Sequence, residues 1–188
     1  MNGICLIEIG PVGPAVTAAV AEHIRSTLET PTRMLPQLEV PASAWDPKRR
    51  QYAAVEMLRA LAAVCPPQAR RLLALTECDL YIPVLSFVFG QAQLDGRLAV
   101  VSLARLRQEF YGLAPHQAML ISRALTEAIH ELGHTFGLVH CIDPGCAMSL
   151  AVDVRHVDRK KDLCRGCLET LRAKTTAATS GIVEEKEP

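Results

Sequence analysis

Residues 130–140 of this chain read His-Glu-Leu-Gly-His-Thr-Phe-Gly-Leu-Val-His. On a helix, His130 and His134 lie about 40° apart around the axis, so both imidazoles can reach one metal ion. Glu131 lies about 100° from His130, where its carboxylate can hold a water molecule beside that ion. The spacing therefore predicts a helix that carries two metal ligands and a candidate general base.

The end of this motif predicts a third ligand. Gly137 permits a backbone turn that other residues adopt at a cost, which ends the helix and brings His140 back toward the metal. Three protein ligands leave one position open, as a catalytic zinc site requires. We therefore expect a zinc metallopeptidase. Two alternatives stay open: three histidines that never meet a metal, and a site that binds zinc without catalysis.

Length and composition are those of one globular domain. The chain has 188 residues, of which 49% are hydrophobic and 21% are charged. Lys plus Arg and Asp plus Glu number 20 each, so net charge favours neither nucleic acid nor an anionic membrane. No apolar run is long enough to span a bilayer.

The first residues predict a strand. Residues 1–9 lack a basic start and carry Glu8 inside an apolar run, which argues against a signal peptide. We therefore expect a soluble, cytoplasmic protein. We also expect it to act as a monomer.

Four of the seven cysteines follow the histidine motif. They are Cys141, Cys146, Cys164 and Cys167. Two close pairs separated by a loop predict a closed tetrahedral site for a structural zinc, which we prefer to an iron–sulfur cluster because the loops are short. Two disulfides or unligated core cysteines are the alternatives. Because Cys141 adjoins His140, this zinc knot, residues 141–167, should stiffen the catalytic site. The other three cysteines lie in apolar segments and are expected to be core residues.

Taken together, these motifs closely resemble the archaemetzincin family. The features shared are the long histidine motif, the cysteine directly after it, a four-residue gap to the next cysteine, a methionine two residues beyond, and the late pair of cysteines. The resemblance implies that His130, His134 and His140 hold a catalytic zinc and that Glu131 is the general base. It implies a second zinc on the four cysteines. It also places Met148 in a Met-turn, a tight turn whose thioether packs beneath the catalytic metal.

The remaining pattern predicts an α/β fold. Strands are expected at 1–9, 35–40, 72–75, 81–94 and 97–103, and helices at 16–28, 50–64 and 115–136. The dipeptide Asp95-Gly96 marks a hairpin, so the sheet should be mixed. We expect a single compact metzincin-like domain over residues 1–173, with a twisted mixed sheet and an antiparallel edge strand packed on helices. The active-site helix should end at Gly137, and the zinc knot should be followed by a C-terminal helix. The polar residues 174–188 predict a disordered tail.

The helix expected at 115–136 has two distinct faces. Leu125, Ala128, Ile129, Leu132 and Phe136 form an apolar stripe, and the two histidines lie opposite it. Arg123 and Glu127 fall on the histidine face, where solvated charge is the ordinary role.

These observations predict hydrolysis of peptide bonds by a zinc-activated water, with Glu131 as general base. An extended substrate would align along the hairpin around Asp95-Gly96. The alternative function is a catalytically inactive, zinc-stabilised module that binds protein or nucleic acid. Nucleic acid is not expected, because acidic residues interleave the basic residues of the knot and no aromatic residue lies near for stacking.

Overall fold

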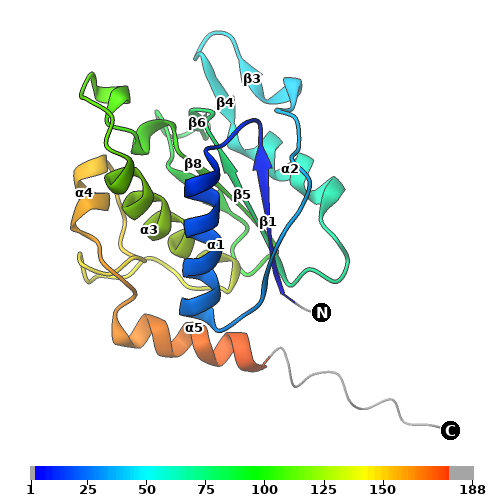
Figure 1. Cartoon of the computed structure of the whole chain (residues 1–188), viewed down its shortest axis with the longest axis vertical. Helices are drawn as coiled ribbons and strands as arrows, with labels where there is room; N and C mark the ends of the chain where they lie inside the picture. The colour runs from blue at the N-terminus through cyan, green and yellow to red at the C-terminus, as the bar shows by residue number, and fades with distance from the viewer. Residues whose placement is uncertain (1–2, 178–188) are drawn as a thin grey trace, which may run out of the picture.

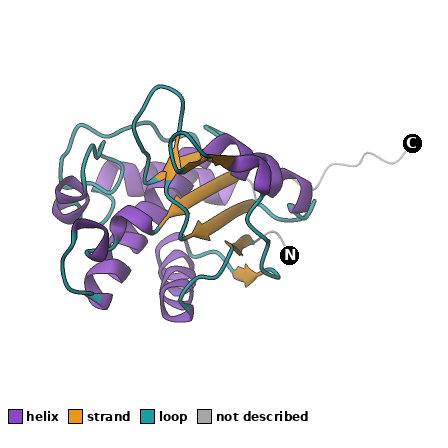
Figure 2. Ribbon diagram, turned by 90° about the horizontal axis from the view of Figure 1, so that it is seen from above, coloured by secondary structure: helices purple, strands orange, loops and turns teal. Residues whose placement is uncertain are grey.

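A computed structural model describes residues 3–177, which form a five-stranded sheet. Helices cover both of its faces (Figures 1 and 2). Its strands, in spatial order, are β2 (Thr32–Met34), β1 (Ile4–Ile9), β5 (Arg71–Thr76), β8 (Leu98–Ser102) and β7 (Gly90–Ala92). The first four are parallel, and β7 pairs antiparallel with β8 at the edge. The predicted mixed sheet with an antiparallel edge strand is confirmed.

The sheet separates two apolar cores. Successive side chains of a strand point to opposite faces, so Ile4 and Leu6 of β1 join one core while Cys5 and Ile7 join the other. Both faces of a mainly parallel sheet must be covered by helices, which explains the near-continuous apolar strands. Cys5 is buried in the second core, as expected, whereas Cys65 and Cys78 are only half-buried against it.

Helices α1 (Pro14–Leu28) and α3 (Gln117–Thr135) cover the first face, and α2 (Ala54–Val64) covers the other. The apolar stripes predicted for α1 and α3 are confirmed, with Leu125 half-buried and the other stripe residues buried. Two further helices, α4 (Val154–Arg159) and α5 (Arg165–Ala177), follow the histidine motif. Short 3-10 turns occupy Ala42–Ala44, Ala104–Leu106 and Glu109–Tyr111. None of the described helices is long and apolar enough to cross a membrane.

A second, three-stranded sheet was not predicted. It consists of β3 (Trp45–Asp46), β4 (Gln51–Ala53) and β6 (Leu80–Tyr81). Because residues 51–53 pair with β6, the helix expected from Arg50 begins at Ala54 instead. The side-chain amide of Gln51 donates to Asp79 Oδ2 at 3.0 Å and helps to hold this segment extended.

Two predicted strands were wrong in their bounds. The strand expected at 35–40 is β2 at 32–34, because Pro36 has no amide proton to give to a ladder. Beyond β2 the chain still follows β1, since the amide of Leu38 donates to the carbonyl of Glu8 at 2.8 Å. The long strand expected at 81–94 is reduced to Leu80–Tyr81 and Gly90–Ala92, and residues 82–89 between them form a loop that includes Pro83.

The hairpin turn between β7 and β8 is confirmed at Asp95-Gly96. Asp95 has a φ of 52°, and the Gly96 amide donates to the Gln93 carbonyl at 3.0 Å. At the other end of the chain, residues 174–177 extend α5, while residues 178–188, which make up the rest of the expected tail, lie outside the described residues.

Candidate metal centres

The turn at the end of α3 sets the path of the histidine motif. Gly137 has a φ of +79°, its amide donates to the His134 carbonyl at 2.9 Å, and the Leu138 amide donates to the Gly133 carbonyl at 3.0 Å. This pair of bonds is a Schellman motif, which reverses the chain directly after a helix. The turn returns His140 to the face of α3 that carries His130 and His134, as the sequence predicted.

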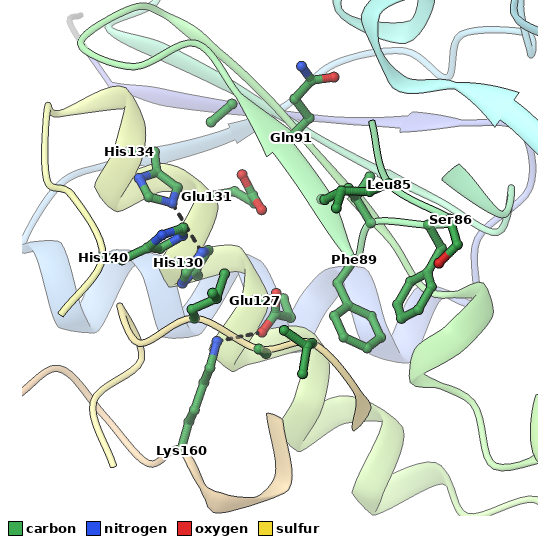
Figure 3. Close-up of a pocket in the computed structure, with 17 residues that line it drawn as sticks. Leu85, Ser86, Phe89, Gln91, Glu127, His130, Glu131, His134, His140 and Lys160 are labelled. Carbon is green, nitrogen blue, oxygen red and sulfur yellow. Dashed lines mark hydrogen bonds and ion pairs between the residues drawn. The ribbon is translucent and has the colours of Figure 1, made fainter. Parts of the chain in front are cut away.

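The three imidazoles converge on one point (Figure 3). One ring nitrogen from each lies within 4.8 Å of the others. His130 Nδ1 lies 2.8 Å from the Ala147 carbonyl oxygen, and His134 Nδ1 lies 2.8 Å from the Leu138 carbonyl oxygen. Carbonyl oxygens only accept, so both Nδ1 atoms carry the proton and both Nε2 atoms present a lone pair.

These two lone pairs face each other, since His130 Nε2 lies 3.1 Å from His134 Nε2. Neither atom can donate to the other in this tautomer, and a cation between them removes the repulsion. Two nitrogens on a tetrahedral zinc, each about 2.0–2.1 Å from the ion, are about 3.3 Å apart. The donor atoms and their spacing therefore fit a zinc ion.

Burial also keeps these rings neutral. Loss of solvation, with the Lys160 ammonium as a second cause, holds the pKa of His130 well below its usual 6.5. Loss of solvation likewise lowers the pKa of His134 and that of His140. Neutral imidazole is the form that binds a metal, so the site favours a cation over protons.

Glu131 lies beneath the edge strand β7. Its side chain is 5% exposed, and burial, followed by the nearby Glu127 carboxylate, raises its pKa well above the ordinary value. Gly90 of β7 lies directly against it, because a Cβ atom at position 90 would be 2.6 Å from Glu131 Oε1. The absence of a side chain at Gly90 is what leaves room for this carboxyl group.

Met148 lies under the histidine helix, where the Met-turn is expected. It is fully buried, and a Cβ atom at Gly133 of α3 would overlap its sulfur. Gly133 lies between the two histidines of α3, so the thioether packs against the backbone that carries them.

The four cysteines after the motif also converge. The Sγ atoms of Cys141, Cys146, Cys164 and Cys167 all lie within 4.8 Å of one another. The 3.9 Å between the Sγ atoms of Cys141 and Cys164 is close to the separation of about 3.8 Å that two thiolates have on a tetrahedral zinc, and far longer than a disulfide. All four are free in the structure.

Backbone amides support these sulfurs. The Cys164 amide donates to Cys146 Sγ at 3.2 Å, and the backbone N–H of Cys167 lowers the pKa of Cys164. Burial, together with the neighbouring thiols, raises the pKa of Cys167. Thiols this close cannot all ionise without a cation to balance them, which fits the chemistry of a four-thiolate zinc site.

Two charged residues of α3 that were expected in solvent are buried instead. Glu127 is 3% exposed, and its Oε1 lies 3.1 Å from Nζ of Lys160, whose side chain is 1% exposed. Arg123 is 5% exposed and binds both carboxylate oxygens of Asp158, at 2.7 and 2.9 Å. The expectation failed because the segment 153–163 folds over this face of α3 and supplies both partners.

A cavity of about 470 Å³ lies beside the three histidines. One wall is β7 and residues 85–89, and the other is residues 150–152, which follow the Met-turn. The three histidines, Glu131, Glu127 and Lys160 lie along it (Figure 3).

Three contributors to the site were missed at the sequence level: Gly90, Ala147 and Lys160. Ala147 acts through its backbone carbonyl oxygen, which any residue type would supply, so the sequence gives no signal of this role. Lys160 lies among basic and acidic residues and is not distinguished by pattern. Only Gly90 offered a signal, since a glycine within a strand often marks a close approach by another group.

Comparison with known proteins gives consistent matches over most of the chain. The model of peptidase family M54 matches residues 16–173. The archaemetzincin of Methanocaldococcus jannaschii is 38% identical over 170 residues, which cover 90% of this chain and 92% of that protein. The archaemetzincin of Methanopyrus kandleri is 39% identical over 173 residues, covering 90% and 95%.

Solved structures agree with these sequence matches. A zinc-dependent peptidase from Methanocorpusculum labreanum superposes with a TM-score of 0.82 at 33% identity, covering 90% of this chain and 100% of the other. The archaemetzincin structure from Methanopyrus kandleri also gives a TM-score of 0.82, at 37% identity, covering 93% and 96%.

Proposed function

The chain belongs to peptidase family M54 and is a zinc metallopeptidase, for which we propose a mechanism with Glu131 as the general base. The observation that carries the proposal is that Nε2 of His130 lies 3.1 Å from Nε2 of His134, with their lone pairs facing each other, beside a buried carboxyl group. His130, His134 and His140 would hold the catalytic zinc. A zinc ion bound there would polarise the substrate carbonyl and make a water molecule more acidic.

Glu131 moves the proton in this mechanism. Its carboxylate takes a proton from the attacking water as the water oxygen bonds to the peptide carbon. The same carboxyl group then delivers that proton to the peptide nitrogen as the carbon–nitrogen bond breaks. In the metal-free protein burial raises the pKa of Glu131, which favours the protonated carboxyl group that exists between the two steps.

The chain's other residues orient these groups. The carbonyl oxygens of Ala147 and Leu138 set the tautomers of two histidines, and Gly90 leaves space for the carboxyl group of Glu131. Met148 would form the floor of the metal site. We propose that Cys141, Cys146, Cys164 and Cys167 hold a second, structural zinc, giving two zinc ions per chain.

The substrate is a peptide or protein, and β7 is the edge along which an extended chain could pair. Action as a monomer and the absence of nucleic-acid binding remain predictions. The alternative of an inactive zinc-stabilised module is not favoured, since the matched solved structures include a zinc-dependent peptidase.

The test combines metal content with cleavage of a peptide mixture by the zinc-loaded protein, with and without chelator. We expect chelator-sensitive cleavage, and a loss of about 10²–10⁴-fold in the Glu131→Gln variant with zinc content unchanged. Glu39→Gln, an exposed site, is the matched control. Full activity in zinc-loaded Glu131→Gln would contradict the mechanism, and two zinc ions without any cleavage would favour the binding module.

A further inference from the structure

The catalytic cavity contains one cationic side chain among the described residues that line it. The cavity runs from the three histidines past Glu131 to the aromatic residues Phe87 and Phe89. Its walls there are apolar, and the charged side chains on its lining are Glu127, Glu131 and Lys160. Figure 3 shows the Lys160 ammonium beside Glu127, joined to it by a dashed line, below the three histidines.

The Lys160 ammonium is buried, and it has more protons than it has hydrogen-bond acceptors among the described residues. Its side chain is 1% exposed, and among the residues that the structure describes Nζ donates to one acceptor, Glu127 Oε1, at 3.1 Å. An ammonium group has three protons, so two donors remain for a further acceptor. Lys160 lines the same cavity as the three histidines, which places its charge close to the metal site.

The charge balance favours an anion in this part of the cavity. A bound zinc ion and one ammonium outweigh the carboxylates of Glu127 and Glu131 by one positive charge. In a cavity with apolar walls this excess is poorly screened, so an incoming carboxylate is stabilised more than it would be at the surface.

The direction of the helix indicates which substrate residue meets Lys160. Glu131 delivers the proton to the leaving amine, so the residue that supplies this nitrogen lies on the Glu131 side of the metal. Glu127 lies one helical turn before Glu131, and Lys160 pairs with it. The cavity on this side of the metal, which Lys160 lines, therefore offers room for the side chain of the residue directly after the cleaved bond.

We propose that Lys160 is a specificity-determining residue, which binds the carboxylate of an Asp or Glu residue directly after the cleaved peptide bond. The proposal rests on the function proposed above. The acidic side chain lies between the two apolar walls, residues 87–89 on one and 151–152 on the other, and its carboxylate takes the two free donors of the ammonium. The ion pair with Glu127, at 3.1 Å, holds the ammonium in place before substrate binds.

The test measures binding separately from cleavage. The probes are blocked, fluorescein-labelled hexapeptides of alanine with one central Glu or Gln, so the side chain is the only carboxylate that differs. Binding is measured by fluorescence anisotropy to the zinc-loaded Glu131→Gln protein, in which we expect cleavage to be slowed by the factor given above. We expect the Glu peptide to bind about tenfold more tightly than the Gln peptide, as a charge-assisted hydrogen bond provides.

In the same background, Lys160→Met should bring the ratio of the two affinities to about one. Lys161→Met removes the same charge from the exposed neighbouring residue and should leave the ratio near ten. If Lys160→Met does not fold, the double variant Glu127→Gln/Lys160→Met removes the buried pair without leaving a lone charge. Equal behaviour of the two peptides, whether both bind or neither does, overturns the proposal, and so does a preference that survives the loss of Lys160.

Turnover by the zinc-loaded parent protein separates this inference from the proposed function. Tighter binding of the Glu peptide without cleavage of any peptide would leave the Lys160 assignment standing and contradict the hydrolytic function. Cleavage with equal kcat/KM for Glu and Gln at the position after the cleaved bond would overturn the Lys160 assignment alone.

Discussion

The imidazole of His130 donates from Nδ1 to the carbonyl oxygen of Ala147, 2.8 Å away. Ala147 directly follows Cys146 of the cysteine cluster and directly precedes Met148. One short segment therefore supplies a thiol to one candidate metal site, orients a ligand of the other and packs a thioether beneath it. Since His140 and Cys141 are also adjacent, the two sites are joined twice through the backbone.

This connection predicts that the cysteine cluster controls zinc affinity at the histidines. In Cys164→Ser we expect the loss of one zinc per chain and a weakening of about 10–100-fold in the affinity of the other, as when groups that orient ligands are removed. Zinc per chain and competition with a fluorescent chelator measure both effects. Cys78→Ser, a half-buried cysteine outside the cluster, serves as the control. Unchanged zinc affinity and activity in Cys164→Ser would show that the two sites are independent.

A second prediction concerns the packing of Met148 beneath α3. Alanine is ordinarily better than glycine within a helix by about 1 kcal/mol. Gly133→Ala should instead destabilise the protein by about 1–3 kcal/mol, because its Cβ atom would overlap the sulfur of the buried Met148. Urea unfolding at equal metal content measures the change. Gly166→Ala in α5, whose Cβ atom meets nothing within 4 Å, should not destabilise. A Gly133→Ala protein as stable as its parent would contradict this packing.

A third prediction concerns Gly90. Gly90→Ala would bring a methyl group to 2.6 Å from Glu131 Oε1, so the carboxyl group must shift from its position. We expect kcat to fall about 100-fold while zinc content stays the same, since small displacements of a catalytic group are costly. Gly13→Ala, at an open position, is the control. A fall in substrate affinity with normal kcat would instead indicate that Gly90 acts only through the substrate.

The histidine pattern was predictable because its geometry is local, and the cysteine pattern was predictable because two close pairs separated by a loop are typical of a zinc site. His130 and His134 share a helix face by spacing alone, and the turn at Gly137 follows from the conformational freedom of glycine. The same holds for α1 and α3, whose apolar stripes repeat with the helical period. The histidine motif and these two helices depend on residues within a few turns of one another.

The unpredicted features depend on contacts between distant segments. The strand at 51–53 forms because β6 lies beside it, which overrides the helical pattern from Arg50. Glu127 is buried because Lys160, 33 residues later, covers it with an opposite charge. A sequence pattern assigns a charge to the surface by default and does not reveal such a partner.

The last prediction concerns the cost of burying the catalytic carboxyl group. Loss of solvation, and then Glu127, raise the pKa of Glu131 well above its ordinary value of 4.5. The folded state then binds this proton more tightly than the unfolded state does. The protein therefore has its full stability, as far as Glu131 is concerned, below pH 4.5, and it loses part of that stability as the pH rises to the pKa of Glu131 in the folded state. Glutamine does not ionise and avoids this loss.

We therefore expect metal-free Glu131→Gln to have a Tm a few degrees above that of the metal-free parent at pH 8, with the difference closing toward pH 4. Thermal unfolding in chelator across this pH range measures it, and Glu39→Gln at the surface should show no such trend. A parent protein at least as stable as Glu131→Gln at pH 8 would show that the carboxylate is solvated or paired in the folded chain. In that case the raised pKa assigned to Glu131 in the metal-free protein would be wrong, because burial would not be disfavouring its charged form.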